Sequence, residues 1–196
     1  MLVKHITFAD VEREAWERSQ ATWLAMTVAA GGLSWAYAAE SAREARAVFR
    51  WRDDAAAKRF QETTRDRAEE AAGRIGRTTI LYLDPVSEFG SAIGAGFVAE
   101  TISWIREGMD HAWLDSQQAF SDVRLRSDGY VGGFVAHGRH MYTVTAFWRD
   151  REAHDHFLRV SVPHLRARWR TDDATAKLIR FRAPLVSALC WAKPIA

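Results

Sequence analysis

The sequence has very little cysteine and no long hydrophobic run. Cys190 is the single cysteine in 196 residues, which excludes an intrachain disulfide framework and any zinc site built from cysteines. No apolar run reaches the roughly 18 residues that a membrane-spanning helix needs. The first residues, Met1-Leu2-Val3-Lys4-His5, lack the basic-then-apolar layout of a secretory signal. These absences predict a cytoplasmic protein with no membrane partner.

Excess charge of one sign is also absent. The sequence has 27 basic and 25 acidic residues, with both signs interspersed. A nucleic-acid-binding domain usually concentrates positive charge on one stripe, so no nucleic-acid partner is expected. There is no glycine-rich phosphate loop and no Gly-x-Ser-x-Gly nucleophile motif. What is abundant is tryptophan: nine indoles indicate aromatic cores or pockets for flat ligands.

The chain repeats itself at an offset of 97 residues. Ala15-Trp16-x-x-Ser19-Gln20 returns as Ala112-Trp113-x-x-Ser116-Gln117, and Trp51-Arg52-Asp53 returns as Trp148-Arg149-Asp150. Eleven of the 46 positions from 15 to 60 are identical to their counterparts, without a gap. Such self-similarity indicates an internal duplication. The repeats are predicted at 1–85 and 97–183, with a linker over 86–96 and a tail over 184–196.

Each copy follows the order strand, helix, strand, strand, helix, strand. The predicted elements of the first copy are a strand 2–8, a helix from a cap at Asp10 to about Ala29, strands 33–38 and 45–51, a helix from Asp53 to about Gly73, and a strand 78–83 that Asp84-Pro85 ends. Those of the second are 97–105, 109–122, 130–136, 140–147, 150–170 and 175–182, with Pro163 predicted to kink or break the long helix.

The βαββαβ order is that of the ferredoxin-like unit, an α+β fold with helices on one face of its sheet. The other face is apolar and uncovered in a single copy, so two copies can shelter each other. The sequence therefore predicts a tandem duplication that forms an intramolecular α+β barrel. This is a pseudo-dimer in one chain, and the sequence leaves open whether it also forms a homodimer.

Several motifs resemble those of a known group. The pattern Trp16…Trp23…Gly31-Gly32…Phe49-Arg50-Trp51…Phe60 resembles the antibiotic-biosynthesis-monooxygenase superfamily of dimeric α+β barrels. Members often carry a His-Asp pair on the second helix. The aligned pair in this chain is Arg65-Asp66, so no role transfers there.

The resemblance implies several activities. The superfamily includes anthrone oxygenases and oxygenases that open a ring of angucyclines, both of which tailor aromatic polyketides. Some members need no cofactor, because an electron-rich phenolate can itself reduce dioxygen, whereas ring-cleaving members are associated with reduced flavin (FADH2 or FMNH2) and hence with a flavin reductase. Haem-degrading and haem-binding proteins and cyclases share the fold, and the fold alone does not choose among them.

An aromatic stripe with a central glutamine marks the first helix of each copy. Trp16, Gln20 and Trp23 stand at i, i+4 and i+7, as do Trp113, Gln117 and Phe120. Gln20 or Gln117 would point into the space between helix and sheet, where it can hydrogen-bond a quinone or phenol oxygen. The alternative is a core glutamine bonded to a backbone carbonyl.

Trp51 and Trp148 occupy equivalent strand ends, where they wall a pocket or plug the end of the sheet. The position of Trp35 differs between the copies, because its counterpart is Gly132, which is followed by Gly133. A tryptophan in one copy and no side chain in the other predicts that the second copy has the open pocket.

Six of the seven histidines lie after residue 110. His164 stands seven residues after Phe157 and is predicted on the same inward face, unless Pro163 reorients it. His140 and Tyr142 are predicted to share one strand face. A histidine is suited to removing a phenolic proton, so His164 or His140 is the candidate base. Surface positions are the alternative, and no spacing matches a metal site.

The sequence therefore predicts an oxygenase acting on a flat phenolic polyketide with dioxygen and without metal. Trp113, Gln117, Tyr142, Trp148, Gly132, Gln20 and Trp51 are the predicted substrate-binding residues. The alternatives are a non-catalytic binding protein for an aromatic metabolite, a cofactorless cyclase, and a haem protein.

Overall fold

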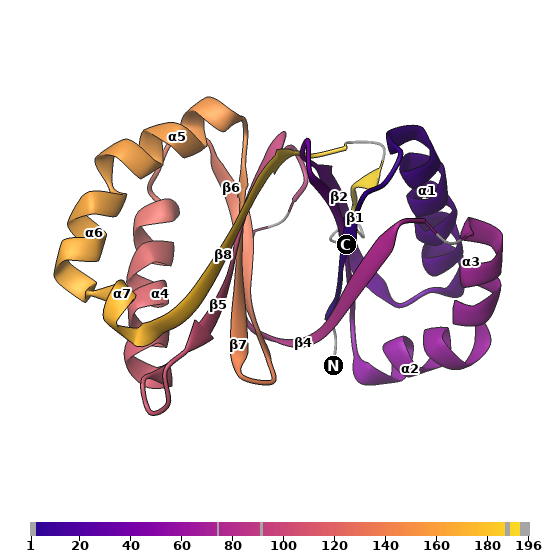
Figure 1. Ribbon diagram of the computed structural model, residues 1–196, viewed down its shortest axis with the longest axis horizontal. Coiled ribbons are helices and arrows are strands. Elements are labelled where there is room, and N and C mark those ends of the chain that lie inside the picture. The colour runs from indigo at the N-terminus through magenta and orange to yellow at the C-terminus, as the bar shows by residue number, and fades with distance from the viewer. Residues whose placement is uncertain (1–2, 74, 91, 187–188, 193–196) are drawn as a thin grey trace. The chain divides into compact units, whose positions relative to one another are not determined.

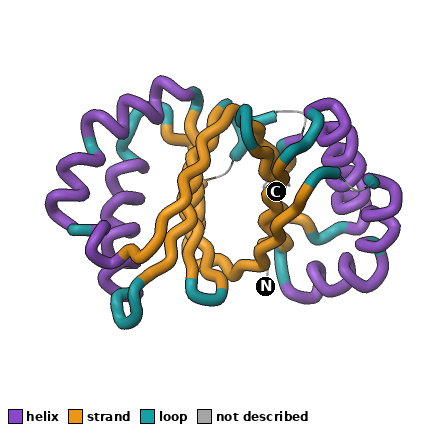
Figure 2. Tube along the Cα trace, viewed as in Figure 1, coloured by secondary structure: helices purple, strands orange, loops and turns teal. Residues whose placement is uncertain are grey.

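A computed structural model describes residues 3–73, 75–90, 92–186 and 189–192. The chain divides into two compact units: a first unit of Met1–Pro85 with Leu185–Ala196, and a second unit of Val86–Pro184. In each unit the helices lie on one face of that unit's own sheet (Figures 1 and 2). The predicted duplication of a ferredoxin-like α+β unit is thereby confirmed.

The first unit contains β1 (Val3–Ala9), α1 (Arg13–Ala30), β2 (Leu33–Glu40), β3 (Glu44–Trp51), α2 (Asp54–Thr63), α3 (Arg65–Ala72), the first part of β4 (Arg77–Gly90), and β9 (Trp191–Ala192). The hydrogen-bonded strand order is β4-β1-β3-β2-β9. The short strand β9 comes from the predicted tail, whose residues 187–188 and 193–196 lie outside the described residues.

The second unit contains the end of β4, then β5 (Phe97–Ile105), α4 (Asp110–Arg124), β6 (Tyr130–Gly138), β7 (Met141–Trp148), α5 (Arg151–Val160), α6 (Val162–Trp169), α7 (Thr171–Ala174) and β8 (Thr175–Pro184). Its strand order is β8-β5-β7-β6, with β4 beside β6. Both units thus place the hairpin and the two outer strands in the same antiparallel order.

A glycine at the same position of each copy lets the second helix approach the sheet closely. Gly32 and Gly129 have φ values of 82° and 76°, a region that favours glycine. A Cβ atom at either position would lie 2.4 Å or 2.5 Å from the Cβ of Ala56 or Ala153, respectively. The duplication therefore preserved a packing contact together with its backbone conformation.

The second helical segment is broken at the same place in both copies. Pro163 was predicted to kink or break the helix, and α5 ends at Val160 while α6 begins at Val162. The first copy has no proline there, yet α2 ends at Thr63 and α3 begins at Arg65. Because Thr64 and Ser161 are equivalent, proline is not required for the break.

Two local predictions are wrong. Glu12, not Asp10, caps α1: its carboxylate accepts hydrogen bonds from the backbone N–H groups of Glu14 and Ala15 (2.9 and 2.7 Å), whereas Asp10 pairs with Arg77 (2.6 Å).

Asp84-Pro85 does not end the strand, because β4 continues to Gly90. Its pairing with β1 ends at Leu83, so the missing N–H of Pro85 removes no hydrogen bond of that ladder.

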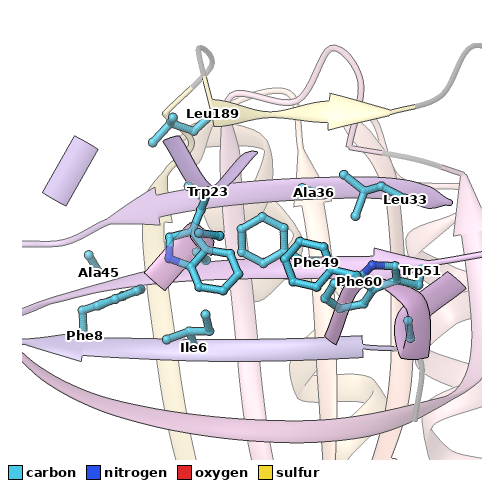
Figure 3. Close-up of a cluster of buried hydrophobic side chains, with 14 of the residues drawn as sticks. Ile6, Phe8, Trp23, Leu33, Ala36, Ala45, Phe49, Trp51, Phe60 and Leu189 are labelled. Carbon is cyan, nitrogen blue, oxygen red and sulfur yellow. The ribbon is translucent and has the colours of Figure 1, made fainter. Parts of the chain in front are cut away.

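The core of the first unit is built from stacked aromatic side chains between its helices and its sheet (Figure 3). Trp23 lies 6.2 Å from Phe49 and 5.7 Å from Phe60, and Trp51 lies 5.5 Å from Phe60, between ring centroids. The ammonium group of Lys4 lies 4.3 Å from the centroid of Trp23. These large side chains fill the space between the two layers.

Candidate functional site

The second unit contains a cavity of about 130 Å³ between its helices and its sheet. The side chains come from the helix-facing sides of β5, β7 and β8 and from α4, α5 and α6, which cover the same sheet face in Figure 1. The lining residues are Ala99, Glu100, Thr101, Ser103, Trp113, Gln117, Phe120, Arg124, Val144, Ala146, Trp148, His154, Phe157, Leu158, Val162, Arg166, Asp172, Thr175, Leu178, Arg180 and Arg182.

The cavity exists because small residues replace large ones at equivalent sheet positions. Phe49 of β3 stands opposite Lys4 and Ala36, and its counterpart Ala146 of β7 stands opposite Ala99 and Gly133. A phenyl ring and a lysine in the first unit thus become two alanines in the second.

The same replacement continues along the neighbouring strand. By the same register, Ile6 and Phe8 of β1 become Thr101 and Ser103 of β5, and both of these line the cavity. On the helix, Trp23 becomes Phe120, which also lines it. The two units share one scaffold, and the second has lost the side chains that fill it.

Two buried titratable residues belong to the cavity lining, Glu100 on β5 and His154 on α5. His154 has its ring on the helix side of the sheet, against cavity-lining aromatic side chains. It lies on α5, is 3% exposed, and has its ring 5.3 Å from Phe97 and 5.7 Å from Trp148. Its Nδ1–H donates to Asp155 Oδ1 at 3.1 Å, because a carboxylate can only accept. Burial lowers the pKa of His154; the bond with Asp155 opposes this, and the charges of Arg182 and Arg124 add to it. The imidazole is therefore neutral near pH 7, with Nε2 as the proton acceptor.

Arg124 brings a positive charge to the same cavity. It lies on α4, half-buried, with its guanidinium 5.6 Å from the ring centroid of Phe120 and 5.8 Å from that of Phe157. It forms no ion pair with any described carboxylate, and loss of solvent lowers its pKa. A guanidinium in this setting is a binding group for an anion. The equivalent residue of the first unit is Thr27, which hydrogen-bonds to the carbonyl of Trp23 (2.7 Å).

Three more arginines line the cavity from the edge strand β8 and from α6: Arg180, Arg182 and Arg166. All three are exposed, and none is ion-paired with a described residue. Partial burial lowers the pKa of Arg180, and the charges of Arg166 and Arg182 lower it further, whereas Asp172 raises it. Of the two acidic lining residues, Asp172 lies near these arginines. Glu100 lies between Ala99 and Thr101 on β5, so its side chain projects to the opposite sheet face. The rim therefore carries net positive charge.

Three of the predicted site residues meet in the cavity wall. Trp113 and Trp148 are buried, and Gln117 is half-buried with its Nε2 donating to Ser116 Oγ at 3.3 Å. Trp148 also packs on Phe157, with centroids 5.1 Å apart. The predicted choice of the second copy thus agrees with the position of this cavity.

Neither candidate base, His164 nor His140, lines the cavity. His164 is exposed on α6, because the break at Ser161 turns that helix and brings Leu165 inward instead. His140 is exposed in the turn before β7, with φ of 73°, and so does not share a strand face with Tyr142. Both assignments rested on continuous elements that the chain interrupts.

Tyr142 and Gly132 also lie outside the lining. Tyr142 stacks on Trp113 (4.7 Å) and donates a hydrogen bond to Asp110 (3.1 Å); burial and this bond raise its pKa. Gly132 pairs with Phe147 on the sheet face away from the helices. The difference between Trp35 and Gly132 therefore concerns that other face, and Ala146 rather than Gly132 opens the cavity.

Gln20 and Trp51 are buried in the first unit. The Oε1 atom of Gln20 and the indole N–H of Trp51 have no hydrogen-bond partner among the described residues. Trp51 packs on Phe60 and Phe49 and belongs to the aromatic core. Their counterparts Gln117 and Trp148 reach the cavity because of the smaller residues around them.

Sequence reasoning missed His154 and the arginines. The two-residue spacing of His154 and His156 on a helix is poor geometry for a shared metal, and His156 is exposed. The position of His154 three residues before Phe157, where the first copy has the buried Ala57, was the available signal. Arg180 and Arg182 alternate with the buried Phe181, which places both on one strand face.

Among the described residues, no group of three histidine, cysteine or acidic side chains could hold a metal ion. No helix in the described ranges is long and apolar enough to cross a membrane.

Comparison with known proteins gives a likeness of fold. No protein-family model matches the sequence. No curated protein matches it. Among solved structures, a candidate monooxygenase from Lactobacillus acidophilus has a TM-score of 0.72 at 10% identity, covering 94% of this chain and 92% of that one.

Two other solved structures extend this likeness. An anthrone oxidase-like protein has a TM-score of 0.67 at 12% identity, with 94% and 91% covered. A ferredoxin-fold protein of Listeria monocytogenes related to antibiotic biosynthesis monooxygenases has a TM-score of 0.55 at 10% identity, with 93% and 94% covered. The resemblance seen in the sequence is therefore confirmed at the level of architecture.

Proposed function

We propose that this chain is an oxygenase that uses dioxygen to oxidise a flat phenolic aromatic molecule, as in the tailoring of aromatic polyketides. The observation that carries the proposal is the cavity of the second unit. There a buried, neutral His154 and Arg124, which forms no ion pair within the described residues, lie among the aromatic side chains of Trp113, Phe120 and Trp148. The oxygenase-like structural neighbours support the same reaction class.

The volume of the cavity limits how the substrate enters. An apolar cavity of roughly 150 Å³ accommodates benzene, so about 130 Å³ accommodates one six-membered ring. Trp113 and Trp148 provide flat surfaces for such a ring. Further fused rings of a polyketide would extend toward the exposed rim on β8 and α6.

His154 is the proposed general base, in place of His164 or His140. Asp155 holds the proton on Nδ1, which leaves the lone pair of Nε2 to accept the phenolic proton. Because burial keeps the imidazole neutral at neutral pH, it is already in the reactive state. General-base catalysis of this kind typically contributes about 10² to 10⁴ in rate.

Arg124 is proposed to stabilise the phenolate that results. Because Arg124 is ion-paired with no described residue, its guanidinium is available to attract a phenolate. Gln117, which has two amide N–H groups and an acceptor oxygen, would orient a second oxygen of the ring system. The protein thus supplies a base, a countercharge and aromatic surfaces.

The proposed reaction with dioxygen starts from an anthrol, the phenolic tautomer of an anthrone. After His154 removes the phenolic proton, the anion transfers an electron to dioxygen, and the two radicals combine at the para carbon. The resulting peroxide anion takes back the proton that His154 removed, and the hydroperoxide then loses water, with the overall change R₂CH₂ + O₂ → R₂C=O + H₂O. The carbon is oxidised by four electrons and dioxygen is reduced by the same four.

Flavin is not used in these steps. The steps require only substrate, dioxygen and the side chains named above.

The test is oxygen uptake by the purified protein with 1,8-dihydroxyanthrone. We expect His154→Ala to reduce the rate by at least about 100-fold. His156→Ala, an exposed histidine on the same helix, should leave the rate unchanged and serves as the matched control.

Equal rates for wild type and His154→Ala would contradict the assignment of the base. Binding of the anthrone without any oxygen uptake would instead support a non-catalytic binding protein. Turnover without oxygen would support a cyclase.

A further inference from the structure

We infer that the substrate carries a carboxylate, which Arg180, Arg182 and Arg166 bind at the rim of the cavity while the phenolic ring lies inside. This inference rests on the proposed function, because it assigns the chemical class of the molecule that occupies the same site. The inference concerns which substrates the site binds. The observations behind it involve the rim arginines and not the proposed base, His154.

The rim is built from two opposing elements. Arg180 and Arg182 stand opposite Thr101 and Ala99, so both side chains project toward the helices from the edge strand β8. Arg166 lies on α6, which covers the same face. Positive side chains therefore border the cavity from the sheet and from the helix layer.

Like charges brought together without acidic partners repel one another. None of the three arginines is ion-paired with a described residue, and Asp172 is the acidic residue that acts on Arg180. A bound anion would relieve this repulsion. Guanidinium groups match a carboxylate geometrically, because each can donate two parallel N–H bonds to its oxygens.

The rim is specific to the unit that has the cavity. By strand register, Arg180 and Arg182 replace Ile80 and Tyr82 of β4, which stand opposite Ile6 and Lys4. At the position of Arg166 the first copy has Glu69. The positive rim and the empty space thus occur together in one copy and are both absent from the other.

A carboxylate is the proposed anion, because its planar pair of oxygens matches the planar fork of each guanidinium. His154 and the rim arginines line the same cavity, which has space for about one ring. The simplest matching molecule has a phenol at one end of a ring and a carboxylate at the other.

The experiment compares three probes by isothermal titration calorimetry: 4-hydroxybenzoate, the neutral 4-hydroxybenzamide, and 4-hydroxyphenyl phosphate. Wild type should bind the acid about tenfold more tightly than the amide, and more tightly than the phosphate. Arg180→Gln and Arg182→Gln should each weaken binding of the acid by about five- to tenfold and leave the amide unchanged. Arg168→Gln removes an exposed arginine of α6 that is absent from the lining, and should change neither.

Equal affinities for acid and amide, no binding of the acid, or an unchanged affinity in both rim variants would overturn the inference. Tighter binding of the phosphate would overturn the choice of a carboxylate. The oxygenase proposal fails separately: a preference for the acid without oxygen uptake from 1,8-dihydroxyanthrone leaves the rim assignment standing. Oxygen uptake without that preference removes the rim assignment alone.

Discussion

The two units use one scaffold for different purposes. Both place a tryptophan at the end of a central strand against a phenylalanine of the second helix, Trp51 on Phe60 and Trp148 on Phe157. In the first unit, Phe49 and Lys4 fill the remaining space, and in the second Ala146 and Ala99 leave it open. A duplicated fold can thus keep one copy as packed support while substitution of a few large side chains creates a site in the other.

The largest expected effect on stability comes from making the first unit resemble the second. Phe49→Ala should lower the free energy of unfolding by about 3 to 5 kcal/mol, because it leaves a cavity among Trp23 and Trp51. Chemical denaturation followed by tryptophan fluorescence measures this. Leu125→Ala, an exposed leucine, is the control and should change stability by less than about 1 kcal/mol.

A loss below about 1 kcal/mol for Phe49→Ala would mean that the first unit is not tightly packed at this position. The first unit would then not be the filled copy, and the contrast with the open second unit would be wrong.

Lys4 offers a pH-dependent test of the same packing. Burial lowers its pKa from 10.5 to about 8; Glu69 opposes this shift and Arg65 adds to it. Between these two values the unfolded chain binds more protons than the folded one, so stability should rise with pH by up to about 3 kcal/mol. At pH 7 Lys4 is charged in both states, so the folded protein is destabilised by this full amount.

Lys4→Met should therefore be more stable than wild type at pH 7, and the difference should shrink between pH 8 and 10.5. Denaturation curves at several pH values provide the measurement. Subtracting the stability–pH profile of the variant from that of wild type removes the contributions of the other groups that titrate in this range. Parallel profiles for the two proteins would show that Lys4 is not buried as a charged group.

The smallest expected effect concerns the break in the second helix. Because the first copy breaks at Thr64 without a proline, Pro163→Ala should keep the break at Ser161. Stability should change by less than about 1 kcal/mol, since Pro163 lies in the first turn of α6, where proline is tolerated. Backbone chemical shifts of residues 158–166 report the break. A continuous helix in the variant would show that Pro163 causes the break.

Much of the fold could be predicted from the sequence because the repeats reinforce each other. The Trp-Arg-Asp junction fixed the start of the second helix in both copies, and Asp53 and Asp150 do cap α2 and α5. The strand through Pro85 could not be foreseen, since it depends on a ladder that ends at Leu83.

The site was harder to predict because it depends on which face each residue occupies. Trp113, Gln117 and Trp148 line the cavity, because helix spacing and strand-end position place them inward. His164 was misplaced by the break at Ser161, and Gly132 by a register shift between Tyr130 and Gly132 in β6. A one-residue change of register moves a side chain to the opposite face, which composition and spacing do not reveal.

The central claim is that the space left by Ala146 binds the substrate. The most direct test is Ala146→Phe, which restores in the second unit the side chain that fills the first. Calorimetry with 4-hydroxybenzamide should show at least about tenfold weaker binding, while circular dichroism shows an intact fold. Wild-type affinity in a folded Ala146→Phe protein would contradict the account.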